Sequence, residues 1–273
     1  MREEDVITEC KDLHNHTRLS YCGDRDVYAY TYVPYCESEK VTTLGISNHL
    51  YYGESELEGK FYKSGAYRAA DLKDELDMIK KMNSNVRVLL GCEVEMFYNK
   101  EPSLSYDEAK MFDYALMSPS HIGNYDYYYR RFFDIDNVKV VQDLLVEQFK
   151  RACYVKYPIP VGMAHPLYPL ISKNEQEIVD GISDSALADC FSLAAKNGIS
   201  IELHACLYRK NTKLDEDGLS PSYMRILSAA KACGCKFHFG SDSHRVSMFV
   251  GSHQKLLLAA KKLGITKNDI WEI

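Results

Sequence analysis

Short apolar segments rich in β-branched residues alternate along this sequence with longer segments that have helical spacing. The short segments, which we expect to be strands, are residues 6–13, 41–47, 86–92, 114–117, 159–163, 198–203 and 236–239. The longer segments, which we expect to be helices, include residues 67–82, 138–154, 185–196, 221–233 and 252–263. Because parallel strands need a crossover connection, this alternation predicts an α/β protein with a parallel sheet. Seven such units favour a closed or nearly closed barrel, and a doubly wound open sheet is the alternative.

Composition and charge exclude several classes of protein. About 46% of the residues are hydrophobic and 26% are charged, as in ordinary globular chains, so the chain is neither disordered nor fibrous. The 33 Lys and Arg residues against 39 Asp and Glu residues give a net charge of −6, which argues against a broad basic face for long nucleic acid. No polar linker separates two halves, so we expect residues 1–273 to form a single domain.

The cysteines and the apolar segments indicate the cellular compartment in which the protein is expected. No stretch approaches the roughly 18 apolar residues of a membrane span, and the acidic residues 1–10 do not resemble a signal peptide. The nine cysteines show neither a regular framework nor a CxxC pair, which indicates reduced thiols and no structural zinc knuckle. We therefore expect a cytoplasmic protein.

Histidines and carboxylates follow the predicted strands at the point where each strand ends. In chain order they are His14 and His16, His49, Glu93, His121, His165, Glu202 and His204, and Asp242 and His244. In a parallel barrel the carboxyl ends of the strands open on one face, so these side chains would meet in a small volume. A lone histidine would indicate only a packed or surface residue. Together, imidazoles and carboxylates are costly to bury without a cation, so the pattern predicts a transition-metal centre.

The order and spacing of these motifs resemble the PHP superfamily, the polymerase and histidinol phosphatase group of metal-dependent phosphoesterases. The resemblance spans nearly the whole chain and depends on residues 12–17, 91–93, 118–121, 164–166 and 240–244. It implies a distorted (β/α)7 barrel of the TIM type, with the metal site at the carboxyl ends of the strands. Such proteins hold two or three divalent transition-metal ions, which here would be Zn, Fe or Mn.

The resemblance also implies a set of ligands. The first ion would bind His14, His16, Glu93 and Asp242, and Glu93 would bridge to a second ion held by His121 and His165. His49 and His244 match two ligands of a third site. Its remaining ligand is often a histidine, and here Cys22 or Asp24 would serve, with Cys22 favoured by position. A thiolate would favour zinc or iron over magnesium.

Substrate-binding residues are less specifically indicated. Residues 201–205, followed by Arg209, resemble a segment of histidinol-phosphate phosphatases in which His204 replaces an asparagine, so the substrate stays open. Glu202 in that segment fits a structural carboxylate equally well. Arginine matches phosphate oxygens in pairs, which makes Arg209 and Arg245 the first candidates for phosphate binding. The other candidates are Arg130 and Arg131, and the rim tyrosines Tyr52 and Tyr128 for a ring-bearing group.

Taken together, these residues predict a hydrolase of a small phosphate monoester that resembles the histidinol phosphatases. Glu93 would bridge the ions, and His204, His244 or a water would protonate the leaving oxygen. One alternative is a phosphodiesterase or exonuclease acting on nucleotides. Another is an amidohydrolase acting on C–N or C–O bonds, although that group usually has a lysine where Glu93 lies. A metal-binding domain without activity is the third. No membrane partner is expected, and the oligomeric state stays open.

Overall fold

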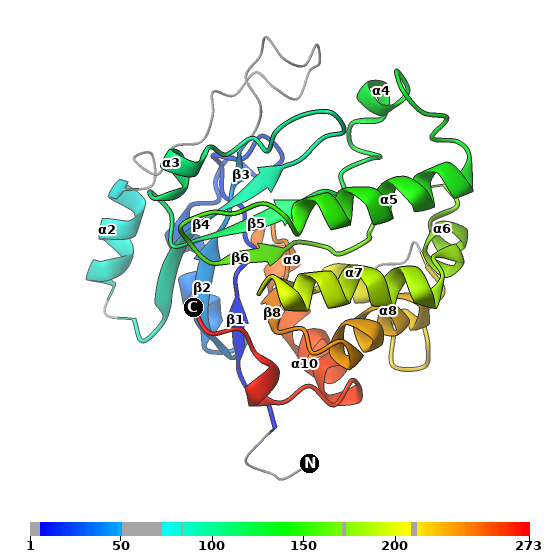
Figure 1. Ribbon diagram of the computed structural model, residues 1–273. Coiled ribbons are helices and arrows are strands. Elements are labelled where there is room, and N and C mark those ends of the chain that lie inside the picture. The colour runs from blue at the N-terminus through cyan, green and yellow to red at the C-terminus, as the bar shows by residue number, and fades with distance from the viewer. Residues whose placement is uncertain (1–5, 51–72, 83, 171–172, 209–211) are drawn as a thin grey trace.

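The computed structural model describes residues 6–50, 73–82, 84–170, 173–208 and 212–273. Its strands are β1 (Cys10–Asp12), β2 (Val41–Ile46), β3 (His49–Leu50), β4 (Arg87–Glu95), β5 (Tyr114–Ser118), β6 (Val161–Met163), β7 (Ser200–His204) and β8 (Phe237–Gly240). They pair in parallel in the order β2-β1-β8-β7-β6-β5-β4-β3, and β2 also pairs with β4, which closes the sheet (Figure 1). Because β2 and β3 both lie beside β4, they share one position. The result is a seven-position (β/α) barrel, as predicted, and not an open sheet.

Helices surround this barrel. They are α1 (Val33–Cys36), α2 (Lys73–Lys81), α3 (Tyr106–Ala109), α4 (Asp126–Tyr129), α5 (Val138–Ala152), α6 (Glu175–Gly181), α7 (Asp184–Lys196), α8 (Pro221–Ala232), α9 (Val246–Phe249) and α10 (Ser252–Lys262). Short 3-10 turns occur at Ala29–Thr31, Ala205–Tyr208 and Lys267–Asp269. The long helices α5, α7, α8 and α10 match the predicted segments within two residues (Figure 1). Of the predicted helix 67–82, residues 67–72 lie outside the described residues.

Side-chain oxygens fix where the long helices begin. Asn137, Ser183 and Ser220 each accept a hydrogen bond from a backbone amide in the first turn of the helix that follows. Such caps satisfy amides that have no partner within the helix. The apolar faces of these helices then pack on the sheet, and Phe149 of α5 meets Phe191 of α7 edge to face with ring centroids 5.4 Å apart. None of the described helices has the length and apolar character needed to cross a membrane.

The barrel interior is filled below the strand ends. Its core contains Leu13, Leu89, Tyr114, Leu116, Ala164 and Trp271. Tyr114 crosses the interior and donates a hydrogen bond to the Leu13 carbonyl, 2.5 Å away. A Cβ atom at Gly91 of β4 would overlap the Tyr114 ring, and one at Gly240 of β8 would overlap the Glu202 carboxylate. Glycine is therefore required at both positions by close approach. In barrels of this kind the active site lies at the carboxyl ends of the strands.

Candidate metal centre

All nine predicted ligands converge at the carboxyl ends of the strands. They form four overlapping groups whose ligand atoms lie within 4.8 Å of one another: His14, His16 and Asp242; His14, Glu93 and His165; His49, Glu93 and His121; and His16, Cys22, His49 and His244. Apart from Cys22 and His244, these residues are at most 8% exposed. The structure thus brings together residues as far apart in sequence as His14 and His244.

Glu93 of β4 lies at the centre of these groups. Its Oε1 atom is 2.8 Å from His165 Nε2 and 3.3 Å from His121 Nε2. Its Oε2 atom faces a different set, at 3.3 Å from His14 Nε2, 3.4 Å from His16 Nε2 and 2.9 Å from His49 Nδ1. Burial opposes ionisation of this carboxyl, but His49, His14 and His121 outweigh it and hold the pKa of Glu93 well below its usual value. One carboxylate therefore faces two clusters of imidazoles.

Hydrogen bonds orient the imidazoles through their Nδ1 atoms. The acceptors are Glu202 Oε1 for His14 (2.7 Å), Ser20 Oγ for His16 (3.1 Å), Glu95 Oε2 for His121 (2.8 Å), Ser120 Oγ for His165 (2.7 Å) and the Asp242 carbonyl for His244 (3.0 Å). The two serine hydroxyls donate elsewhere, to Asn48 and to the His165 carbonyl, so their oxygens accept from the rings. Nδ1 then carries the hydrogen, and Nε2 turns toward the centre.

This orientation leads to a test of whether the residues fit metal ions. His14 Nε2 lies 3.1 Å from His16 Nε2, and His121 Nε2 lies 3.1 Å from His165 Nε2. Two ring nitrogens that each hold a lone pair need a cation between them, either a proton or a metal ion. In addition, Glu93 Oε2 is buried without a hydrogen-bond partner among the described residues. Imidazole nitrogens and carboxylate oxygens are the donor set that zinc, iron and manganese take, so the residues fit such ions.

Two buried carboxylates support this arrangement. Glu202 joins two strands, because its Oε1 accepts from His14 Nδ1 and its Oε2 accepts from the His165 amide at 2.5 Å. Glu95, which we did not predict, accepts from His121 and from the Tyr125 hydroxyl at 3.1 Å. A signal for Glu95 was present, since residues two apart on a strand share a face and Glu95 follows Glu93 at that spacing.

Backbone conformation at two strand ends is also unusual. His165 and Asp242 have φ values of 28° and 50°, in the left-handed region that side chains disfavour. Such conformations persist where the surrounding contacts impose them, and they cluster at functional sites. The amides of both residues are held, that of His165 by Glu202 and that of Asp242 by the His14 carbonyl at 2.9 Å.

The fourth group settles which of two candidates lies beside His49 and His244. The Cys22 thiol belongs to this group, whereas the carboxylate of Asp24 belongs to none of the groups found in the described residues. Residue 22 as a whole is exposed, while its thiol turns toward the two imidazoles. Burial of the thiol raises its pKa, but His49 and His244 outweigh this and lower the pKa of Cys22 to about 6.

His204 and His244 carry their ring hydrogen on different nitrogen atoms. His204 Nδ1 accepts a hydrogen bond from the Cys206 amide at 3.0 Å, so its Nε2 atom carries the hydrogen. That Nε2 lies 3.2 Å from Asp242 Oδ2. In His244 the reverse holds, because Nδ1 donates to the Asp242 carbonyl and Nε2 keeps the lone pair. His204 is thus a hydrogen-bond donor, and His244 has the form of a ligand.

The predicted substrate-binding residues are only partly brought to the centre. Arg130 is exposed and forms ion pairs with Asp136 (2.8 Å) and Asp126 (3.4 Å). The Tyr128 hydroxyl donates to the Tyr98 carbonyl at 2.5 Å, so its polar tip is committed to packing. Arg245 is exposed directly after His244. Arg209 and Tyr52 lie outside the described residues.

Two further histidines, His238 and His253, fall within the predicted last strand (residues 236–239) and the predicted last helix (residues 252–263), and local spacing indicates no partner for either. The position of His238 in β8 is confirmed, and its Nδ1 lies 2.8 Å from Ser200 Oγ. His253 lies in α10, and its ring contacts the carboxylates of Asp12 and Glu39. Both partners are more than 200 residues away in sequence, so no local spacing could reveal them.

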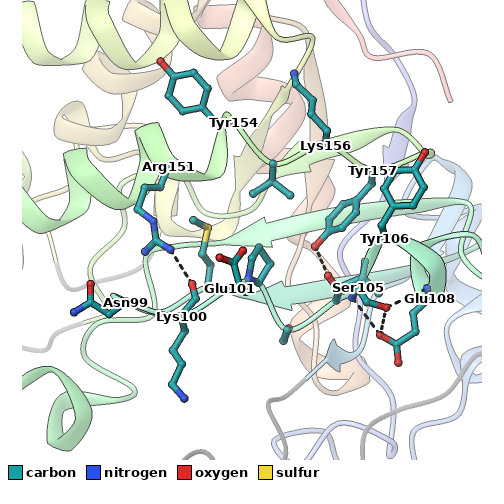
Figure 2. A pocket seen from close by; sticks show the side chains of 15 residues that line it. Asn99, Lys100, Glu101, Ser105, Tyr106, Glu108, Arg151, Tyr154, Lys156 and Tyr157 are labelled. Carbon is teal, nitrogen blue, oxygen red and sulfur yellow. Dashed lines mark hydrogen bonds between the residues drawn. The ribbon is translucent and has the colours of Figure 1, made fainter.

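One hollow of the described surface lies away from these four groups. It measures about 940 Å³ and lies between residues 96–108 and residues 151–157 (Figure 2). Arg151, one of its basic residues, donates to the Phe97 and Lys100 carbonyls, and Tyr157 donates to the Leu104 carbonyl. None of the residues in the four groups lines it. These side chains hold a loop in place, and the candidate metal ligands lie instead at the strand ends.

Comparisons with known proteins agree with this fold. A histidinol phosphate phosphatase from Lactococcus lactis, solved with zinc, L-histidinol and phosphate, is 13% identical; the match covers 96% of this chain and 94% of that one, with a TM-score of 0.64. A proposed histidinol phosphatase from Listeria monocytogenes is 16% identical, with 89% of this chain and 98% of that one covered and a TM-score of 0.66. No protein-family model and no curated protein sequence matches the chain. The resemblance seen in the sequence is therefore confirmed at the level of the fold: this chain has the barrel fold of histidinol phosphatase structures.

Proposed function

We propose that this chain is a metal-dependent phosphoesterase that hydrolyses a small phosphate monoester, in the manner of a histidinol phosphatase. The observation that carries the proposal is the set of ring nitrogens and carboxylate oxygens that face one another at about 3 Å around Glu93. When bound, two or three divalent Zn, Fe or Mn ions would stabilise the phosphoryl oxygens and activate the attacking water. The structural likeness to histidinol phosphatases supports the same chemistry.

The nine predicted ligands would divide among two or three ions. His14, His16, Glu93 and Asp242 would hold the first, and Glu93, His121 and His165 the second. His49, His244 and Cys22 would hold a third, and the thiolate favours zinc or iron there. Glu93 would join the first two sites, because its two oxygens face the two clusters.

We propose roles for His204, His244 and a water at the leaving oxygen from the hydrogen bonds that the two histidines make. In this structure the Nε2–H of His204 faces Asp242 Oδ2, and we propose that it is shared with the leaving oxygen when substrate binds. Nδ1 of His204 is occupied by the Cys206 amide, so Nε2–H is the hydrogen that His204 can offer. A water would supply the proton itself, and His244 would act as a ligand. Arg245, exposed next to His244, is the candidate for a phosphate oxygen.

The rival functions differ in the bond they break. An amidohydrolase centre usually has a bridging lysine, whereas the bridging position here holds Glu93. A nucleotide phosphodiesterase would use the same ligands, so only substrates separate it from a phosphatase. For location, all nine cysteines are free of disulfides, which supports our prediction of a cytoplasmic protein.

The experiment is a substrate panel with purified protein, with metal content measured in parallel. The panel contains histidinol phosphate, sugar phosphates, nucleoside monophosphates, a phosphodiester and an amide. We expect hydrolysis of at least one monoester, with at least two metal ions per chain. Turnover of the diester alone would support the phosphodiesterase, and turnover of the amide alone the amidohydrolase. A fully loaded protein inactive on every compound would overturn the proposal.

A further inference from the structure

A second cluster of buried charges lies outside the barrel, behind the metal centre. His253, in the first turn of α10, is completely buried, with Nε2 2.7 Å from Asp12 Oδ2 and Nδ1 3.0 Å from Glu39 Oε2. Carboxylate oxygens only accept, so both ring nitrogens carry a hydrogen and the ring is an imidazolium. Burial opposes this charge, but Asp12 and Glu39 outweigh it and raise the pKa of His253. Asp12, His253 and Glu39 form what we call the carboxylate–histidine chain.

The Asp12 end of this chain reaches the two strands that carry the first group of ligands. Asp12 Oδ1 accepts from the His14 amide at 3.1 Å and from the Ser241 amide at 3.2 Å. His14 is itself a ligand in the proposed centre, and Ser241 directly precedes Asp242. The same strand ends are joined by backbone bonds from Asp242 to His14 and from His16 to Ser243. One carboxylate therefore ties β1 to β8 next to their ligands.

The Glu39 end reaches only a helix. Glu39 Oε1 accepts from the Gly251 amide at 2.7 Å, which fastens the start of α10. None of the contacts described for Glu39 goes to a ligand or to a ligand-bearing strand end. The two ends of the chain of residues therefore have different roles. Asp12 holds the backbone next to His14 and Asp242, and Glu39 holds the start of α10 in place.

We propose that His253 is a positioning residue, which fixes the Asp12 carboxylate and thereby the backbone from which His14, His16 and Asp242 reach the centre. The proposal rests on the proposed function only in assuming that these residues bind metal. A carboxylate that accepts two amides with one oxygen can still rotate, and the bond from His253 to the other oxygen removes this freedom. Partners of this kind are worth roughly 10- to 100-fold in metal affinity.

A merely structural role for His253 predicts a different result. If His253 only anchors α10, its loss would lower stability and weaken every ion to the same extent. If it positions the first group, the loss is confined to the ion held by His14, His16 and Asp242. The ion held by His121 and His165 would be spared, because these residues follow β5 and β6 and make no contact with Asp12 that the structure describes.

The test compares stepwise Zn²⁺ affinities and the unfolding temperature of the metal-free protein in four variants. His253→Gln removes the imidazolium, and Asp12→Asn weakens the hold on the two amides. Glu39→Gln is the control for the helix anchor. His238→Gln is the matched control, since His238 is another buried histidine whose described hydrogen bond goes to Ser200.

We expect His253→Gln and Asp12→Asn to weaken one Zn²⁺ equivalent roughly tenfold or more and to leave the others unchanged. Glu39→Gln lowers the unfolding temperature with less than about a threefold change in any affinity, and His238→Gln leaves all affinities unchanged. Equal weakening of every equivalent, or no change in His253→Gln, would overturn the proposal. If His253→Gln does not fold, Asp12→Asn against Glu39→Gln decides. Zinc binding is measured without substrate, so failure of the phosphatase proposal would not affect this result.

Discussion

Glu93 is the side chain on which the proposed centre depends most, because its two oxygens face both clusters of imidazoles. Glu93→Gln removes the negative charge and keeps the size. We expect turnover to fall more than the roughly 10- to 100-fold typical of supporting residues, with a much smaller change in KM. Steady-state kinetics with metal content measured on the same sample checks this. A variant with full metal occupancy and a near wild-type rate would show that Glu93 does not bridge.

Cys22 is the single residue that distinguishes a third metal site from a dinuclear centre. Its thiol lies with His16, His49 and His244, so Cys22→Ser should lose about one ion per chain. Asp24→Asn should keep its metal, because that carboxylate lies in none of the groups in the described part of the chain. Elemental analysis of both variants checks this, and alkylation of Cys22 should become faster after chelation. Unchanged metal content in Cys22→Ser would show that Cys22 is not needed to hold an ion.

The side chain of Tyr114 in β5 leaves no room for a side chain at Gly91 in the neighbouring strand β4. A methyl group at Gly91 would overlap the Tyr114 ring, so Gly91→Ala should destabilise the protein by about 1–3 kcal/mol, the cost of overpacking. Thermal unfolding measures the loss. Replacing Tyr114 with Leu in the Gly91→Ala background should relieve the overlap, so the two changes together should cost less than the sum of the single changes. Additive losses would mean that the ring and the glycine do not interact.

The strands and the polar residues gathered at their ends were predictable because each signal was local. The alternation of strand and helix segments predicted seven strands. The histidines and carboxylates at the strand ends predicted where the site lies, because the strand ends of a parallel barrel meet on one face. The short helices α1, α3, α4, α6 and α9 were missed, because four to seven residues are too few to show a helical period. The partners of His253 were missed for a different reason: Asp12 lies 241 residues away, and only the fold brings it near.

For the molecule as a whole, the metal-free centre must hold protons where ions would bind. Two pairs of histidines face each other through their Nε2 atoms: His14 with His16, and His121 with His165. In each pair one histidine has a raised pKa and the other a lowered one. Burial opposes the charge on His121, but Glu95 and Glu93 raise its pKa to about 9, while burial lowers the pKa of its partner His165 to about 4. Burial likewise opposes a charge on His14, which Glu202 and Glu93 outweigh to raise its pKa, and burial lowers that of His16. At pH 7 each pair therefore shares one proton.

This distribution predicts how metal affinity depends on pH. A histidine with a raised pKa is protonated at pH 7 and must release its proton before its Nε2 atom can bind an ion. Zn²⁺ affinity should thus rise between pH 7 and pH 9, as His121 loses its proton near pH 9 in the metal-free protein. At pH 7, binding should release about one proton from each pair, measurable by calorimetry in buffers of different ionisation enthalpy. His165 and His16 contribute nothing in this range, because their lowered pKa values leave them neutral. His121→Gln should remove the release from one pair and keep the other, whereas a Zn²⁺ affinity independent of pH from 7 to 9 would contradict proton sharing in both pairs.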